Sequence, residues 1–142
     1  MTKFPAIVLA ACLLSACQPA EEGAGSAPAE TYNGIAAEET IYFTGTEPFW
    51  GGEIAGGKAL YTTPENQDGS RFEVQRFAGN NGLSFTGSMD GRAFDLMVTP
   101  GDCSDNMSDR SYPFVATLEI GGEQLSGCAW TNRQGFTDLR TP

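Results

Sequence analysis

The sequence predicts an all-β fold, a small antiparallel meander of about eight strands that closes into a barrel. Apolar and polar residues alternate with a period of two from Ile41 onward, as in strands that bury one face. Short segments that favour hairpin turns separate these runs. No helical apolar face follows the apolar N-terminal stretch. Such a meander avoids open edges by closing into a barrel, and a two-sheet sandwich is the alternative.

The strands follow from the alternating runs in order. Pro48 interrupts strand pairing and implies a bend or an edge after the first run. Asp90-Gly91 is the strongest turn signal, because alternation continues directly on both of its sides. The other expected primed turns are Gly56-Gly57, Asn80-Asn81 and Gly121-Gly122. The expected strands are roughly 40–46, 49–54, 58–63, 71–77, 83–89, 92–99, 113–120 and 123–130.

The longest expected loop runs from Pro100 to Tyr112 and contains Cys103. Cys103 and Cys128 form an even pair after the N-terminal cysteines are set aside, and no Cys-x-x-Cys motif is present. We therefore expect a structural disulfide that ties this loop to the last strand, with two free redox thiols as the alternative.

The N-terminus has the layout of a secretory signal peptide. Lys3 precedes an apolar run, Phe4 to Leu14, that is too short to span a bilayer. Leu14-Ser15-Ala16-Cys17 resembles a bacterial lipobox, which implies cleavage after residue 16 and a lipid on Cys17. Gln18 follows rather than Asp, which implies sorting to the outer membrane. An ordinary cleaved signal, or a soluble protein with an apolar start, is the alternative.

Three segments are therefore expected: a signal peptide at 1–16, a lipidated cysteine with a flexible tether at 17–39, and one barrel-like domain at 40–142. The tether consists mostly of Ala, Glu, Gly and Pro, a composition that does not form a core. About twenty such residues have a root-mean-square reach of roughly 25 Å.

Composition restricts the function. The chain has no histidine, which excludes Ser-His-Asp and Cys-His catalysis and His-ligated zinc. The formal charge is −10, and loss of Lys3 with the signal makes it −11. Such a surface repels nucleic acid and favours basic partners. We expect no cofactor, and a membrane contact through the N-terminal lipid.

Two segments hold the candidate site residues. In the 100–112 loop, Arg110 and Tyr112 are residue types found at binding hot spots, with Asp109 beside them. The alternative interpretation is purely structural: the Asp side chains cap turns, and Arg110 pairs with a carboxylate. Calcium ligation by the acidic residues is weakly supported, because the spacing is not that of an EF-hand; we predict no metal site. The loop's other oxygen donors are Asp102, Asp105 and Asn106.

The second segment is Thr44 to Trp50. Phe49 and Trp50 should point to opposite faces, one into the core and the other near a barrel mouth or the surface. Trp50 is a candidate binding residue, although a core position is favoured for it. Glu47 with an Asp of the 102–109 loop is a weak candidate acid–base pair.

These segments resemble those of a family of uncharacterised bacterial periplasmic proteins and lipoproteins. The resemblance rests on four stretches across about residues 40 to 130: Gly45–Trp50, Tyr61–Glu65, Cys103–Pro113 and Gly127–Ala129. It implies envelope location and the Cys103–Cys128 pair, and it implies no activity. A looser similarity to lipoprotein inhibitors of c-type lysozyme covers architecture only, because their Ser-Gly-Ser-Gly-type loop is not found here.

The sequence therefore favours a non-catalytic binding or inhibitor module on the periplasmic side of the outer membrane, with a basic envelope protein as partner. A barrel that binds a small ligand near Trp50 is the first alternative. A carboxylate-based hydrolase ranks last.

Overall fold

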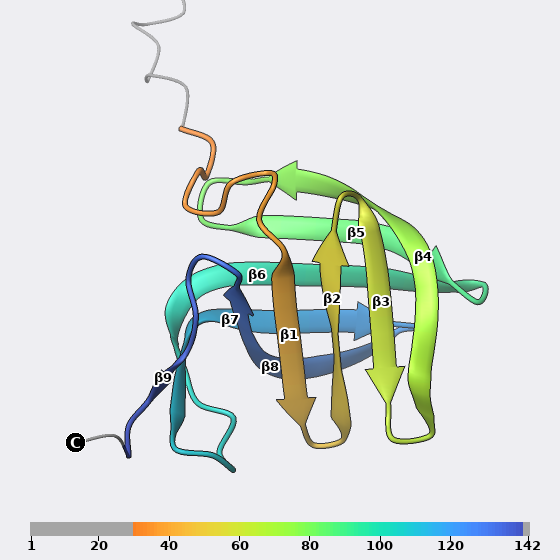
Figure 1. Ribbon diagram of the computed structural model, residues 1–142. Coiled ribbons are helices and arrows are strands. Elements are labelled where there is room, and N and C mark those ends of the chain that lie inside the picture. Colours follow the sequence, from red (N-terminus) through yellow and green to blue (C-terminus); the bar gives the residue numbers. More distant parts are fainter. Residues whose placement is uncertain (1–29, 141–142) are drawn as a thin grey trace, which may run out of the picture.

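The computed structural model of the protein describes residues 30–140. The expected signal peptide, Cys17 and the first part of the expected tether lie outside the described residues. Within the described range, no helix is sufficiently long and apolar to span a bilayer. The folded part consists of strands joined by turns (Figure 1), as the period-two alternation predicts.

Eight strands form the body of the fold, and a ninth is only two residues long. They are β1 (Ile41–Thr46), β2 (Phe49–Ala55), β3 (Lys58–Thr63), β4 (Asn66–Ala78), β5 (Leu83–Met89), β6 (Arg92–Cys103), β7 (Arg110–Ile120), β8 (Glu123–Thr131) and β9 (Thr137–Asp138).

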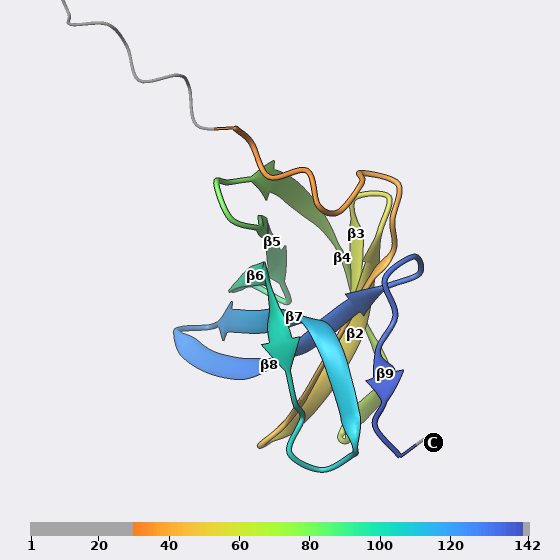
Figure 2. The same ribbon diagram turned by 90° about the vertical axis from the view of Figure 1, so that its left-hand side faces the viewer.

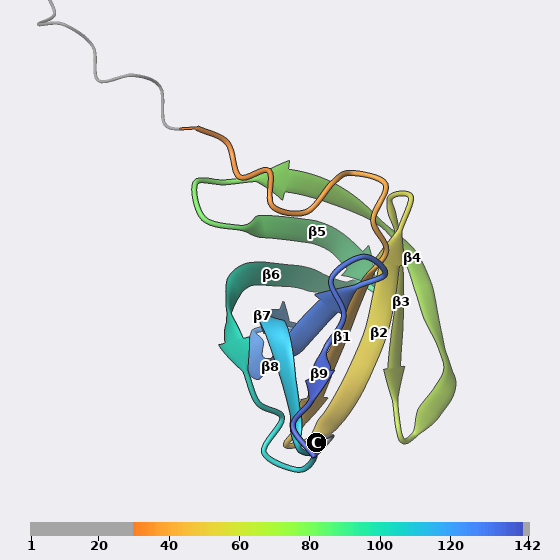
Figure 3. The ribbon, with the colours of Figure 1, turned by 60° about the vertical axis from the view of Figure 1, so that its left-hand side comes forward.

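The eight strands close into a barrel, which confirms the predicted fold class. Each pairs antiparallel with its neighbours in sequence, and β8 returns to β1. The closing ladder is short, running from Ile41↔Thr131 to Thr44↔Cys128. Figures 2 and 3 show the strands curving around one interior, with β9 beside the start of β7. Closure pairs the first strand with the last, although the first part of β4, residues 66–73, pairs with β3 alone.

The hairpin turns follow the sequence with one exception. Asp90 and Gly91 both adopt positive φ, at 51° and 80°, as a type I′ turn requires. The predicted turn at Asn80-Asn81 is wrong, because positive φ falls on Gly82 instead. A hydrogen bond from Gly79 N to Gly82 O (2.9 Å) closes that longer loop.

The predicted strand bounds differ most at β4, which begins at Asn66 rather than at about 71, and in the hairpin of β6 and β7. The expected loop 100–112 shortens to 104–109, because β6 continues to Cys103 and β7 already begins at Arg110. Pro100 has no N–H group to donate to the ladder. The register shifts after Pro100, and pairing resumes between Cys103 and Tyr112. A bulge therefore carries the hairpin beyond the point where the alternation stops.

Side chains fill the barrel interior. Twenty buried apolar residues form one contiguous cluster. Phe94, at its centre, packs edge-on against Phe72 and Tyr61, with ring centroids 4.8 Å and 6.1 Å apart. Each large side chain buried in this way stabilises the fold by about 1.5–3 kcal/mol. The other fully buried large apolar side chains are Phe43, Ile35, Leu96, Leu118 and Val98.

The folded part begins earlier than the predicted boundary at residue 40. Ile35 is 1% exposed and belongs to the core cluster. The main chain around it is held by Tyr32 N donating to Gly79 O (2.7 Å) and by Arg76 donating to Ile35 O (2.9 Å). Ile35 is the one large aliphatic residue in a segment of small and polar residues, and burying it orders its neighbours against the barrel.

Glu39 joins this N-terminal segment to the end of β8. Its buried carboxylate accepts hydrogen bonds from Ala36 N (2.9 Å), from Thr131 Oγ1 and from Gln134 Nε2 (3.4 Å). Desolvation raises the pKa of Glu39, but the three hydrogen bonds and the charge of Arg133 outweigh it and leave the pKa below its usual value. The charge of Glu39 is therefore satisfied although the residue is buried.

Candidate recognition arm

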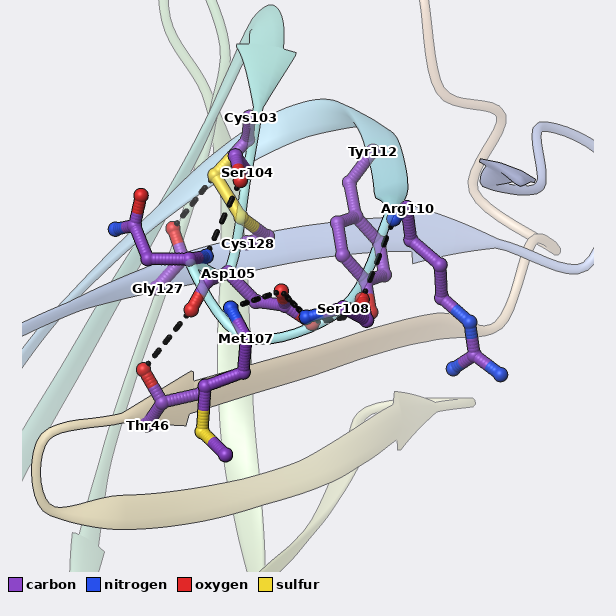
Figure 4. The surroundings of a disulfide bond; sticks show 11 residues. Thr46, Cys103, Ser104, Asp105, Met107, Ser108, Arg110, Tyr112, Gly127 and Cys128 are labelled. Carbon is purple, nitrogen blue, oxygen red and sulfur yellow. Dashed lines mark hydrogen bonds between the residues drawn. A yellow bond between two sulfur atoms is a disulfide. The ribbon is translucent and has the colours of Figure 1, made fainter. Parts of the chain in front are cut away.

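The candidate site is the far end of the β6–β7 hairpin, residues 100–113, here called the arm. Cys103 in the arm forms a disulfide with Cys128 of β8, with the two Cα atoms 5.6 Å apart. This confirms the predicted disulfide. Thr46 Oγ1 at the end of β1 donates to Asp105 O (3.1 Å), so the arm is also held to the first strand. Figure 4 shows the arm crossing β8 at the disulfide.

Asp105 organises the loop at the end of the arm. One carboxylate oxygen accepts from Met107 N (3.0 Å) and Ser108 N (2.8 Å). The other accepts from Ser108 Oγ (2.7 Å) and Tyr112 Oη (3.2 Å) (Figure 4). Main-chain and side-chain donors thus converge on one carboxylate, the arrangement of an Asp that caps a turn. The loop therefore has one well-defined conformation.

The electrostatics of Asp105 reflect these contacts. Desolvation alone would raise its pKa, but the N–H groups of Ser108 and Met107 and the hydroxyls of Ser108 and Tyr112 outweigh that effect. Together they lower the pKa of Asp105 from 3.8 to about 2. Hydrogen bonds to the ionised form stabilise it relative to the neutral acid. Asp105 is therefore ionised throughout the physiological range.

Asp105→Asn is expected to lower the free energy of unfolding by about 1–3 kcal/mol at pH 7, because it weakens several hydrogen bonds to a charged group. The pKa is depressed in the folded state, so this contribution is present above about pH 4 and is lost as the pH falls through about 2. Urea unfolding at pH 7 and pH 2.5 measures the difference. Asp102→Asn, at an exposed neighbour, is the control, and an equal loss in both variants would contradict the role of Asp105.

Tyr112 lies beneath the loop rather than on its surface. Its ring is buried against Trp130 of β8, with centroids 5.3 Å apart. Trp130 stacks in turn on Tyr42 of β1 (5.4 Å), and Phe136 contacts both Tyr112 (5.5 Å) and Trp130 (5.8 Å). These four aromatic residues form a small second cluster outside the core of the barrel. Tyr112 therefore supports the arm, and any direct contact with a partner falls to its neighbours.

Arg110 and Asp109 lie together at the edge of the arm. The guanidinium of Arg110 lies 4.2 Å from the centroid of the Phe136 ring, a favourable cation–π contact. The ion pair at this edge joins Asp109 to Arg140 instead. The expected pairing of Arg110 with a carboxylate is therefore replaced by stacking on an aromatic ring.

Trp50 belongs to the barrel core and not to the arm. It is 4% exposed, whereas Phe49 beside it is 51% exposed, which confirms the predicted opposition of the two side chains. The indole lies directly against Gly45, where a Cβ atom would be 2.0 Å from Nε1. Within the described residues, that Nε1 is the one buried side-chain polar atom without a hydrogen-bond partner. An open depression of about 350 Å³ lies beside Phe49 and Trp50.

Two grooves flank the arm where the barrel seam opens. Beyond Thr44↔Cys128, β1 no longer pairs with β8. A groove of about 210 Å³ lies between arm residues 103–106, residues 44–46 and Gly127. A second groove, of about 390 Å³, is lined by Glu47, Asn106 and Met107 together with residues 124–126. The loop 104–109 at the tip of the arm therefore contributes to the walls of both grooves.

Met107 is the residue that the sequence analysis missed. Its side chain is 66% exposed at the tip of the loop. The sequence offers one signal for this residue, a methionine that stands alone among Asp, Asn and Ser residues. A large apolar side chain in an exposed polar loop has no core to pack against, and its presence there suggests a contact with another molecule.

The acidic residues of the arm do not converge on a common point. No group of three or more Cys, Asp or Glu side chains within residues 30–140 could hold a metal ion. Asp105 is engaged by the loop's own donors and Asp109 by Arg140. Glu47 is exposed beside Met107 in the larger groove.

No family model, curated protein or solved structure matches this chain. The family resemblance therefore stays a prediction.

Proposed function

We propose that the protein is an outer-membrane lipoprotein with a non-catalytic binding or inhibitor role, and that the tip of the arm is its contact surface. The observation that carries this proposal is the loop 104–109. Asp105 and the Cys103–Cys128 bridge hold this loop in one conformation, and Met107 projects from it. A large apolar side chain on a rigid polar loop is a suitable anchor for a protein interface.

Rigidity favours this function energetically. A loop that is already ordered loses little conformational freedom on binding, so more of the contact energy appears as affinity. The two grooves beside the loop 104–109, the larger of them lined in part by Met107, provide concave surface into which a partner can place side chains. The arm therefore offers both a projecting anchor and adjacent hollows.

Charge favours a basic partner. The chain carries a formal charge of −10, and Glu47 and Asp102 are exposed around the arm. An acidic surface attracts a basic protein over a distance and accelerates encounter, and salt weakens this attraction. A basic envelope protein is the partner class that fits this surface.

The filled interior favours protein recognition over capture of a small ligand inside the barrel. Phe43, Phe94 and Leu118 occupy the space that a ligand would need. The depression beside Trp50 is open and lies next to the half-exposed Phe49. A hydrolase role is disfavoured, since two of the three Asp residues that could pair with Glu47, Asp105 and Asp109, are engaged elsewhere.

Membrane attachment rests on the sequence. Lys3, the apolar run that follows it and Leu14-Ser15-Ala16-Cys17 together have the features of a lipoprotein signal. Gln18 after the cysteine favours the outer membrane. The lipid would keep the barrel at the bilayer surface, where its partner would also be located.

Affinity capture from an envelope extract tests the proposal. The full-length protein is expected to retain a basic protein at low salt and at least tenfold less of it at high salt. Met107→Ser should reduce retention about tenfold or more, because the anchor is lost. Met97→Ser, at a half-exposed methionine on β6, is the matched control and should bind normally in an extract solubilised with detergent, where no bilayer is present. Absence of a salt-sensitive partner, or equal retention by both variants, would refute the proposal.

A further inference from the structure

A second apolar surface lies on the barrel wall, apart from the loop at the tip of the arm. Phe77 of β4 is 67% exposed and Met97 of β6 is 49% exposed. Ser84 of β5 lies between them in register, so the three side chains share one face of the sheet. The small serine leaves a groove of about 270 Å³ between the two large side chains. These three residues are here called the Phe77–Met97 patch.

The patch is uncharged on a strongly acidic protein. None of the eight residues that line its groove carries a charge, although the chain has a net charge of −10. An exposed apolar surface of this kind indicates contact with another apolar surface.

The chain leaves the barrel beside this patch. Tyr32 N donates to Gly79 O (2.7 Å), and Gly79 lines the groove itself. Figures 1 to 3 show the segment from residue 30 to 40 running along the end of β4 and the start of β5. Whatever is attached to the N-terminal part of the chain is therefore tethered closest to this side of the barrel.

We infer that the Phe77–Met97 patch rests on the membrane to which the chain is anchored. The inference depends on the proposed lipid at Cys17. Residues 18–29 separate that cysteine from the first described residue, and a flexible linker of twelve residues would span about 20 Å on average. The patch can therefore reach the bilayer surface.

Tethering makes a small patch sufficient for docking. A linker of this length holds the barrel at an effective concentration in the millimolar range near the lipid, so docking becomes an intramolecular step. Two apolar side chains inserted at the headgroup boundary then bias the orientation of the barrel. Docking by this face would leave the tip of the arm, which lies at the opposite end of the molecule from the segment 30–40 (Figure 1), facing the aqueous phase.

Site-specific quenching tests the orientation. A nitrobenzoxadiazole label on Ser84→Cys is compared with the same label on Gln67→Cys, which lies near the start of β4, at the opposite end from the segment 30–40 (Figure 1). The lipidated protein is reconstituted in phosphatidylethanolamine and phosphatidylcholine vesicles with brominated acyl chains. We expect at least twofold stronger quenching at Ser84→Cys. Phe77→Ser with Met97→Ser should reduce it to the level of Gln67→Cys.

The outcomes separate this inference from the proposed function. Mass spectrometry first establishes whether Cys17 carries the lipid, and an unmodified Cys17 would overturn lipid anchoring and docking together. Lipidated protein with equal quenching at the two labels would overturn docking alone. A concentration-dependent emission shift at Ser84→Cys in detergent, without vesicles, would assign the patch to a second copy of the chain and would also overturn docking.

Discussion

Replacement of Cys103 and Cys128 by serine in one variant is expected to lower the free energy of unfolding by about 3 kcal/mol. The bridge joins positions 25 residues apart, and a crosslink of that span restricts the unfolded chain by about this amount. Urea unfolding of the wild type and the double variant, followed by tryptophan fluorescence, measures the difference. The far-ultraviolet dichroism of the variant should remain that of a β protein, because the ladders of the barrel persist.

The same variant should also free the arm. Amide exchange in residues 104–109 is expected to accelerate far more than exchange in the β1–β2 ladder, because the bridge holds the arm to β8. Partner capture by Met107 should weaken along with it. An unfolding free energy within 1 kcal/mol of the wild type, or uniform acceleration of exchange across the barrel, would show that the bridge does not position the arm.

Phe94→Ala is expected to lower the free energy of unfolding by about 3–5 kcal/mol, the usual cost of removing a buried phenylalanine. Phe94 has no exposed surface and contacts the rings of Tyr61 and Phe72. Truncation removes these contacts and leaves a cavity that the closed barrel cannot easily fill. Phe77→Ala removes the same side chain from an exposed position, and its effect should remain within about 0.5 kcal/mol.

The Phe94→Ala variant also tests whether the interior is filled. A new apolar cavity should bind a small apolar molecule such as benzene, which would raise the melting temperature of the variant and not that of the wild type. If the variant unfolds before it can be measured, Leu118→Ala at a fully buried position removes a smaller side chain and gives a milder form of the test. Stabilisation of the wild type by benzene would mean that the barrel already contains open space.

Much of the barrel could be predicted because its determinants are local. Alternation in each strand follows from burial of one face, and Asp90-Gly91 directly specifies the turn between β5 and β6. The extent of β6 could not be predicted in this way. Pro100 and Gly101 end the alternation, and pairing resumes at Cys103 through a bulge that depends on tertiary contacts.

The start of the folded part could not be predicted either, because it also depends on tertiary contacts. Ile35 stands alone among small and polar residues, and a single aliphatic side chain has no periodicity from which a buried segment could be recognised. Its place in the core is set by distant partners, including Arg76, which donates to its carbonyl oxygen.

Cys103 and a run of polar residues single out the arm in the sequence. The contacts within the arm are only partly predictable. Capping by an aspartate was expected, and Asp105 provides it. The cluster of Tyr42, Tyr112, Trp130 and Phe136 was not expected, because these residues come from segments far apart in the chain. An alternating strand pattern shows that a side chain faces outward, but it does not show what will cover it.

The way the barrel closes also sets the order of events during synthesis. The hydrogen bond from Thr40 N to Asn132 Oδ1 joins residues 92 positions apart, and the β1–β8 ladder lies next to it. Because the chain emerges N-terminus first, whether from a ribosome or across a membrane, β1 is available long before β8 and keeps one edge unpaired until nearly the whole domain has emerged. Contacts of such long sequence separation form slowly. A nascent chain that stalls before β8 would expose the unpaired edges of β1 and β7, to which other chains could pair.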